Sequence, residues 1–296
     1  MSKLSDSNIR SIVPIVPPKK FLERFLADKE LGDFVLNSRR QIVDILTGKD
    51  PRMLAIVGPC SMDRPEAGLE YAKRLAELSQ KLNKKLFIVM RAYPEKSRTR
   101  LAWPGYMQRP NLKDLDMENG LYGVRDFLEE LAKLRLPVAT EFVDSIASQY
   151  LALLVSWVAV GARAVENQGY RDRASGLSMP VGFKNSISGN IQTAVDAIVW
   201  AQNPNSFLGI DFETGQAAIF TSEGNPYSHL VLRGGDSGPN YDSTSVADAI
   251  IQLEKAQLSP HLVIDCSHGN SQKIAERQIP ACNAVLAQRL AGNKNI

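Results

Sequence analysis

Short apolar segments alternate with amphipathic segments along most of this chain. The apolar runs have strand length and start near Leu54, Leu86, Val138, Val158, Val181, Phe207 and Leu262. Between them, apolar residues recur at helical spacing in the segments 65–83, 121–134, 145–155, 190–202 and 243–257. Strands that are apolar on both faces are typical of a parallel sheet covered by helices, and such a sheet is built by regular alternation of strand and helix.

The number of predicted strands favours a barrel over an open sheet. The first strand ends at Gly58-Pro59 and is not followed by the glycine pattern of dinucleotide-binding folds. We therefore predict an α/β protein with a TIM (β/α)8-type barrel. A helix over 271–290 follows the last strand, and no eighth strand is visible after it, so the predicted barrel is incomplete at its C-terminal end.

Two segments lie outside the alternation. Residues 1–20 contain three prolines and are followed by one or two amphipathic helices over 21–47, so we predict an N-terminal extension over 1–52 ahead of a barrel domain over 53–296. Between 211 and 235, the short apolar runs 217–221 and 229–232 flank the polar segment 222–226. This pattern predicts a β-hairpin inserted after the sixth strand.

Composition narrows the possible functions. The chain has 296 residues and a formal net charge of +3, which gives no basis for nucleic-acid binding. No apolar run is long enough to span a membrane, and the N-terminus has no secretion signal. The odd cysteine count, from Cys60, Cys266 and Cys282, is typical of a reducing compartment. We therefore expect a cytoplasmic protein without a disulfide framework.

Basic residues stand at or just after the ends of several predicted strands. The carboxyl ends of parallel strands meet at one end of a barrel, so these side chains are expected to converge. Lysine and arginine that converge in this way bind phosphate and carboxylate groups, which favours a small polyanionic ligand. The alternative is that each is an ordinary solvated surface residue. The residues concerned are Arg91, Lys96, Arg98, Arg163, Lys184 and Arg233.

Cys60 and His268 follow the first and the last predicted strands, and a thiolate with an imidazole suits a divalent metal ion. A cysteine in such a position is more often a small buried apolar residue. A catalytic site also needs carboxylates, and Glu141 is the nearest candidate, although it could instead hold a basic neighbour. Spacing alone assigns no chemistry to Ser178 or Phe207.

Taken together, these motifs resemble the type I 3-deoxy-D-arabino-heptulosonate 7-phosphate (DAHP) synthases, in family order and over nearly the whole chain. The resemblance implies an aldol-type transferase that condenses phosphoenolpyruvate with erythrose 4-phosphate and releases phosphate, at the first step of the shikimate pathway to the aromatic amino acids. The motifs are Gly58-Pro59-Cys60-Ser61, Glu95-Lys96-Ser97-Arg98-Thr99, Gly161-Ala162-Arg163, Gly182-Phe183-Lys184-Asn185, Leu232-Arg233-Gly234-Gly235 and Asp265-Cys266-Ser267-His268-Gly269-Asn270.

The resemblance also implies roles for single residues. Phosphoenolpyruvate would be held by Arg91, Lys96, Arg163, Lys184 and Arg233, with Glu141 lining the site. Arg98 and Thr99 would meet erythrose 4-phosphate, and Lys96 would give a proton to the forming alkoxide. Cys60 and His268 would bind a divalent metal (Mn2+, Fe2+, Co2+ or Zn2+), which would act as a Lewis acid.

By the same resemblance, the N-terminal extension and the hairpin imply a homo-oligomer, a dimer or a tetramer, with a feedback site for an aromatic amino acid near Ser178 and Phe207. Some positions depart from the family pattern. Ser97 replaces a proline and Tyr170 replaces a histidine, which indicates a divergent paralogue with altered regulation or aldehyde preference.

The family continues beyond the position of Ile296 with an eighth strand and two further metal ligands. From this we expect the chain alone to be inactive or impaired. The alternatives are a fragment of an active synthase, and a truncated, inactive paralogue that binds phosphoenolpyruvate or an aromatic amino acid. A different barrel aldolase is disfavoured by the motif set.

Overall fold

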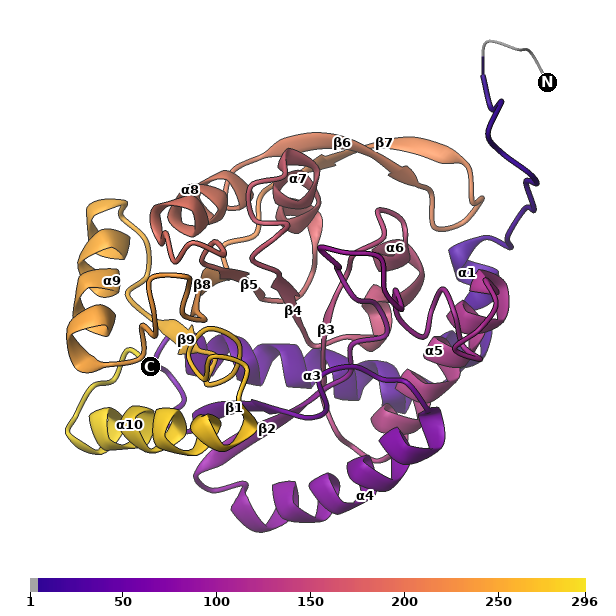
Figure 1. The fold of residues 1–296 in the computed structure, drawn as a ribbon. Helices are drawn as coiled ribbons and strands as arrows, with labels where there is room; N and C mark the ends of the chain where they lie inside the picture. Colours follow the sequence, from indigo (N-terminus) through magenta and orange to yellow (C-terminus); the bar gives the residue numbers. More distant parts are fainter. Residues whose placement is uncertain (1–4) are drawn as a thin grey trace.

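A curled sheet of seven parallel strands forms the centre of the molecule (Figure 1). The computed structural model describes residues 5–296. In spatial order the strands are β1 (Met53–Val57), β2 (Leu86–Arg91), β3 (Val138–Glu141), β4 (Trp157–Val160), β5 (Val181–Lys184), β8 (Ser228–Leu232) and β9 (Leu262–Ile264). The middle strands β4, β5 and β8 are buried throughout, which explains why their sequences are apolar without alternation.

Helices cover the outer side of the curl (Figure 1). They place apolar residues such as Val124, Leu128 and Ile198 in one cluster with the outward-facing strand residues Met90 and Val158. Side-chain caps begin two of them, because Asp116 and Asp242 accept backbone N–H groups of the first turn. The helices are α4 (Pro65–Leu82), α5 (Met117–Lys133), α6 (Ala147–Leu151), α7 (Gln168–Gly176), α8 (Gln192–Ala201), α9 (Ser243–Lys255) and α10 (Gln278–Leu290), with 3-10 turns Ala152–Leu154 and Ala275–Arg277.

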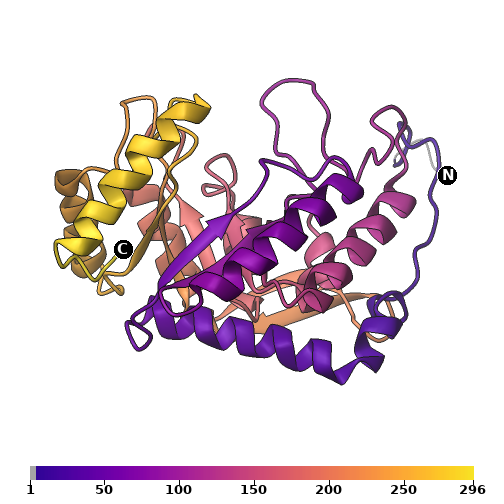
Figure 2. The ribbon, with the colours of Figure 1, turned by 90° about the horizontal axis from the view of Figure 1, so that it is seen from below.

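The N-terminal segment closes one end of the curl. It forms α1 (Pro18–Phe21), α2 (Glu23–Ala27) and the long helix α3 (Lys29–Leu46). Figure 2 shows α3 crossing the end of the sheet opposite the long loops that follow the strands. Ile42 and Leu46 of α3 pack into the inner cluster with Phe87, Val89 and Trp157. The extension is therefore part of the core, and it closes the end of the curl opposite the carboxyl ends of the strands.

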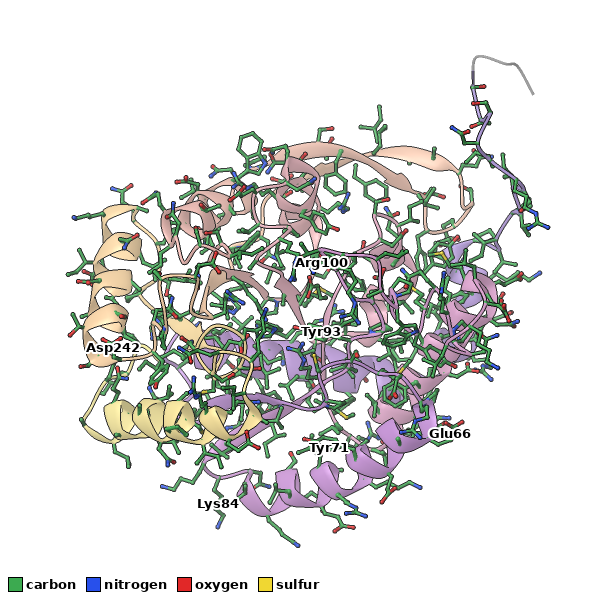
Figure 3. The ribbon with its side chains drawn as sticks, viewed as in Figure 1. Glu66, Tyr71, Lys84, Tyr93, Arg100 and Asp242 are labelled. Atoms are coloured by element: carbon green, nitrogen blue, oxygen red, sulfur yellow. The ribbon has the colours of Figure 1, made fainter. Side chains whose placement is uncertain are left out.

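Side chains fill the interior almost completely, with Tyr93 near the centre of the view (Figure 3). Tyr93 is 2% exposed. Below it, the Trp157 indole N–H donates to Nε2 of His229 over 3.1 Å, which requires a neutral imidazole. Burial lowers the pKa of His229 to about 4, so it stays neutral and acts as a packing residue. None of the helices in the described part of the chain is long and apolar enough to cross a membrane.

The hairpin differs from its predicted position. It consists of β6 (Asn205–Ile210) and β7 (Ala217–Ser222), paired antiparallel, and it precedes the sixth strand of the central sheet. The run 229–232, predicted as half of the hairpin, lies in β8, which pairs parallel with β5 and β9. The prediction was wrong because β6 was taken as a central strand. Alternating exposure along β6 and β7 identifies the hairpin, whereas β8 is buried on both faces.

The curl is open between β1 and β9. Within the described residues, β1 pairs only with β2, and β9 pairs only with β8. A cavity of about 510 Å³ lies along both edges, lined by residues such as Met53, Leu54, Val263 and Ile264. Residues near the end of the chain enter this gap, where the Leu262 N–H donates to the Asn295 carbonyl over 2.8 Å. The seven parallel strands agree with the predicted number and with a TIM-type barrel architecture.

The packing of α3 gives the first testable prediction. Ile42 is fully buried between the helix and the inner cluster, so I42A should leave a cavity and lower the free energy of unfolding by about 2–5 kcal/mol. L36A on the same helix is the matched control, because Leu36 is 57% exposed and its loss should change stability by less than about 0.5 kcal/mol. Urea unfolding measures both. Equal effects would show that α3 does not belong to the core.

Candidate active site

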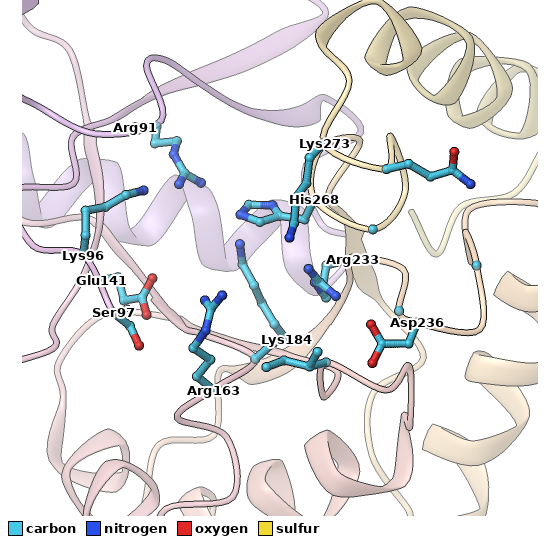
Figure 4. A pocket seen from close by; sticks show the side chains of 17 residues that line it. Arg91, Lys96, Ser97, Glu141, Arg163, Lys184, Arg233, Asp236, His268 and Lys273 are labelled. Atoms are coloured by element: carbon cyan, nitrogen blue, oxygen red, sulfur yellow. The ribbon is translucent and has the colours of Figure 1, made fainter. Parts of the chain in front are cut away.

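A pocket of about 370 Å³ opens at the carboxyl ends of the strands (Figure 4). Its walls come from the ends of β2 to β5, β8 and β9 and from the loops that follow them. Six cationic side chains face two carboxylates there, which makes the pocket strongly basic. The charged lining residues are Arg91, Lys96, Arg163, Lys184, Arg233 and Lys273, with Glu141 and Asp236.

One buried ion pair forms the floor of the pocket. Nζ of Lys184 lies 2.8 Å from Oδ2 of Asp265, with the two side chains 7% and 13% exposed. Burial alone would raise the pKa of Asp265, but Lys184 and His268 hold it well below its usual value. Burial likewise acts to lower the pKa of Lys184, and Asp265 reverses this, so its pKa is raised. The pair therefore stays fully charged at neutral pH, and Lys184 remains a cation.

His268 contacts the same carboxylate. Its Nδ1 lies 2.7 Å from Oδ2 of Asp265, although the ring N–H is poorly aligned for a hydrogen bond. Contact with Asp265 raises the pKa of His268, but burial and the charge of Lys184 outweigh it, and the pKa is lowered. The imidazole is therefore neutral at physiological pH.

Cys60 follows the carboxyl end of β1 and lies among cationic side chains. Nζ of Lys96 donates to its sulfur over 3.1 Å and to its carbonyl over 2.8 Å, and Arg91 also donates to this carbonyl over 3.2 Å. Burial raises the pKa of the Cys60 thiol, but Lys96, Arg91 and Arg98 more than compensate, so the pKa is lowered. Burial also lowers the pKa of Lys96. The Cys60 sulfur and the Lys96 amine are thus held together, and the lowered pKa makes Lys96 a better proton donor than a free lysine.

Glu141 and Arg163 form the opposite wall. A Cβ at Gly161 would come 2.4 Å from Oε1 of Glu141, so only glycine lets this carboxylate take its position. Nε of Arg163 donates to the Thr99 hydroxyl over 2.7 Å, which ties the loop after β2 to the tip of β4. Arg98 does not line the pocket, because its Nε donates to the Trp103 carbonyl within the same loop.

The role of Glu95, which positions the loop that carries Lys96, was not predicted from the sequence. Glu95 is 1% exposed, and its carboxylate accepts the backbone N–H groups of Val143 and Asp144 over 3.0 and 2.9 Å, and the Gln108 amide over 3.1 Å. Burial raises the pKa of Glu95 from 4.5 to about 7, against the effect of these donors. The one hint in the sequence was that Glu95 directly precedes Lys96, a predicted substrate lysine.

Tyr170, a departure from the resembled family, supports the same junction. Its hydroxyl donates to the Val143 carbonyl over 2.6 Å, so Val143 is bonded through both of its backbone groups. Most of the predicted catalytic and substrate-binding residues line this pocket, whereas Cys60, Arg98 and Thr99 lie beside it without lining it. The predicted regulatory residues lie elsewhere. The rings of Phe207 and Phe220 stack in the hairpin with their centroids 5.7 Å apart, and Ser178 is exposed after the end of α7.

The residues do not form a complete metal site. Their protonation suits ligation, because the lowered pKa values of Cys60 and His268 favour a thiolate and a neutral imidazole. However, no group of three His, Cys, Asp or Glu side chains within residues 5–296 is arranged to hold an ion. Lys96 donates to the sulfur of Cys60, and Asp265 contacts Nδ1 of His268, so the imidazole could offer only Nε2 to an ion. The described residues therefore offer at most part of a coordination shell.

Comparison with known proteins identifies the family. The model of the DAHP synthetase I family matches residues 27–294. The chain belongs to the DAHP synthetase I family. It is 42% identical over 294 residues to the Tyr-sensitive phospho-2-dehydro-3-deoxyheptonate aldolase of Escherichia coli, covering 99% of this chain and 82% of that protein. It is also 42% identical to the Trp-sensitive enzyme of Buchnera aphidicola, covering 100% and 85%.

A solved structure agrees with the family assignment. The phospho-2-dehydro-3-deoxyheptonate aldolase of Francisella tularensis superposes with a TM-score of 0.93 at 41% identity, covering 98% of this chain and 84% of that one. The predicted resemblance is confirmed, and with it an enzyme family of aldolase type. The alternative of an inactive binding paralogue is not favoured by these comparisons.

The buried Glu95 gives a prediction on pH. Its folded-state pKa is raised, so the folded protein keeps a proton that the unfolded chain has released. The free energy of unfolding should therefore fall as pH rises from about 4.5 to about 7, by roughly 3 kcal/mol, and then level off. E95Q cannot titrate and should lack this slope. Urea unfolding of both proteins across this pH range measures the effect. If the free energy of unfolding depends on pH in the same way for wild type and E95Q, the assignment is contradicted.

Proposed function

We propose that this chain catalyses the condensation of phosphoenolpyruvate with erythrose 4-phosphate and releases phosphate, as DAHP synthases do. The observation that carries the proposal is the basic pocket in a member of this family. Phosphoenolpyruvate bears a phosphate and a carboxylate on a small carbon frame. A pocket of this size with cations on several walls suits such a compact polyanion.

Each charged residue of the pocket has a proposed role that follows from its position. Asp265 keeps Lys184 charged. Lys184 would bind the anion together with Arg233 and Arg163, which line the same pocket. Arg91 stacks at 3.8 Å on the ring of Tyr93, which fixes the plane of its guanidinium for two parallel hydrogen bonds. These cations would neutralise phosphoenolpyruvate and orient its methylene carbon toward the aldehyde.

Lys96 is the proposed proton donor. When the carbon–carbon bond forms, the aldehyde oxygen becomes an alkoxide that must be protonated. Lys96 lies on the loop positioned by Glu95, and burial lowers its pKa, which suits proton transfer near neutral pH. A divalent metal remains a proposal from the family resemblance. Cys60 and His268 would supply donors to it, and no step above is routed through it.

Regulation and assembly also remain proposals. Two of the relatives are named as Tyr-sensitive and Trp-sensitive enzymes. We propose that an aromatic amino acid acts near Ser178 and Phe207, and that the extension and the hairpin mediate a dimer or a tetramer. The hairpin exposes Leu208 and Ile219 by 77% and 75%, which supports an apolar contact there.

The direct test is turnover of the full chain with both substrates, measured as DAHP formed and phosphate released. R163M should reduce kcat/KM for phosphoenolpyruvate by about 10- to 100-fold, because a charged hydrogen bond to the anion is lost. Arg163 is exposed, so the fold should be retained. R74M is the control, since the Arg74 side chain is 80% exposed on α4 and its one ion pair among residues 5–296 is with Glu70. Binding of phosphoenolpyruvate without any product would instead support the inactive paralogue.

A further inference from the structure

The loop after β9 has an unusual backbone. His268, Gln272 and Lys273 have φ values of +52°, +53° and +63°, in the left-handed region that residues other than glycine rarely adopt. Such conformations cluster at functional sites, where surrounding contacts enforce them. His268 already belongs to the pocket, but neither the motifs nor the resemblance gave a role to Gln272 or Lys273.

The surroundings of this loop hold it firmly. Asn270 is 3% exposed, its amide donates to the carbonyls of Asp265 and Leu232, and its backbone N–H donates to Arg233. A Cβ at Gly269 would come 2.7 Å from the backbone nitrogen of Gly235, so the loops after β8 and β9 are in direct backbone contact. The Lys273 N–H then donates to the His268 carbonyl over 2.8 Å. The left-handed turn is thus fixed by the fold.

This turn directs Lys273 into the basic pocket. Figure 4 shows its side chain beside His268, on the wall formed by the loop after β9. Gln272 and Lys273 both line the pocket. No ion pair among the described residues includes Lys273, whereas Lys184 in the same pocket is neutralised by Asp265. Lys273 is exposed to solvent at the pocket wall, and it adds a cation to an already basic pocket, so an anion bound there would lower the repulsion among these charges.

The proposed substrates carry two phosphate groups, so a further cation in the pocket would have an anion to bind. Arg98 was expected to meet the second phosphate, but it is bonded to the Trp103 carbonyl and does not line the pocket. Two phosphorylated substrates bring more negative charge than phosphoenolpyruvate alone. Lysine supplies a compact point charge suited to a phosphate group.

We propose that Lys273 is a phosphate-binding residue of this pocket, held in place by the left-handed turn after β9. The inference deepens the proposed function and rests on it for the identity of the phosphate, which belongs to phosphoenolpyruvate or to the phosphosugar. The residue acts by direct contact with the anion.

The test uses the full chain with three variants of Lys273 and one control. K273M removes the charge, K273R keeps it, and K273G removes it while suiting the left-handed backbone. K255M is the control, since Lys255 is exposed at the end of α9 and does not line the pocket. Calorimetry measures binding of inorganic phosphate and of phosphoenolpyruvate, and steady-state kinetics measure KM for each substrate.

K273M and K273G should weaken phosphate binding about tenfold or more, with K273R close to wild type and K255M unchanged. A raised KM for phosphoenolpyruvate assigns the contact to its phosphate, and a raised KM for erythrose 4-phosphate assigns it to the sugar. K273G should not lower the thermal unfolding midpoint, which separates anion binding from a structural role.

Unchanged phosphate binding and unchanged KM values in K273M would overturn the inference. If the wild-type chain forms no product, the proposed function fails by itself. Phosphate and phosphoenolpyruvate binding that still depends on Lys273 would then support the inference alone, and binding that does not depend on it would overturn both.

Discussion

Mutual repulsion of the pocket cations is the constraint on which the site depends. Six lysine and arginine side chains line about 370 Å³, and two like charges 4 Å apart in such surroundings repel by about 4 kcal/mol. Asp265 relieves the most buried part of this repulsion. It pairs with Lys184 and keeps that side chain charged, and it also contacts His268, whose pKa burial and Lys184 nevertheless lower. The remaining cations reach solvent or an incoming anion.

The parallel sheet explains how such a cluster can be built at all. Each strand ends in the same direction, and each contributes one or two polar residues from its tip. The opposite end is closed by Ile42 and Leu46 of α3, so stability is concentrated at one end and chemistry at the other. Loops then adjust the site. Glu95 and Tyr170 both bond the backbone of Val143, and in this way they join the loop of Lys96 to β3 and α7.

Much of this could be predicted from the sequence because the signals are local. Apolar runs located the parallel strands, and basic residues directly after them located the pocket. The hairpin was misplaced because β6 and β8 are similar short apolar runs, and their pairing partners and burial distinguish them only in the folded protein. The contact that Arg98 makes in the structure was not predicted, for a related reason. A basic residue in a loop can turn toward the loop itself, and the sequence does not show that Trp103 offers a carbonyl there.

The roles that the sequence did not show depend on tertiary contacts. Glu95 looks like an ordinary polar residue until the backbone N–H groups of Val143 and Asp144 meet its carboxylate. Lys273 looks like a surface lysine until the turn after β9 takes a left-handed backbone. In both cases the fold imposes an unfavourable state, a buried carboxylate or a strained backbone, next to a cation of the pocket. Since such states cost stability, their position beside the anion pocket is an argument that they serve binding rather than folding.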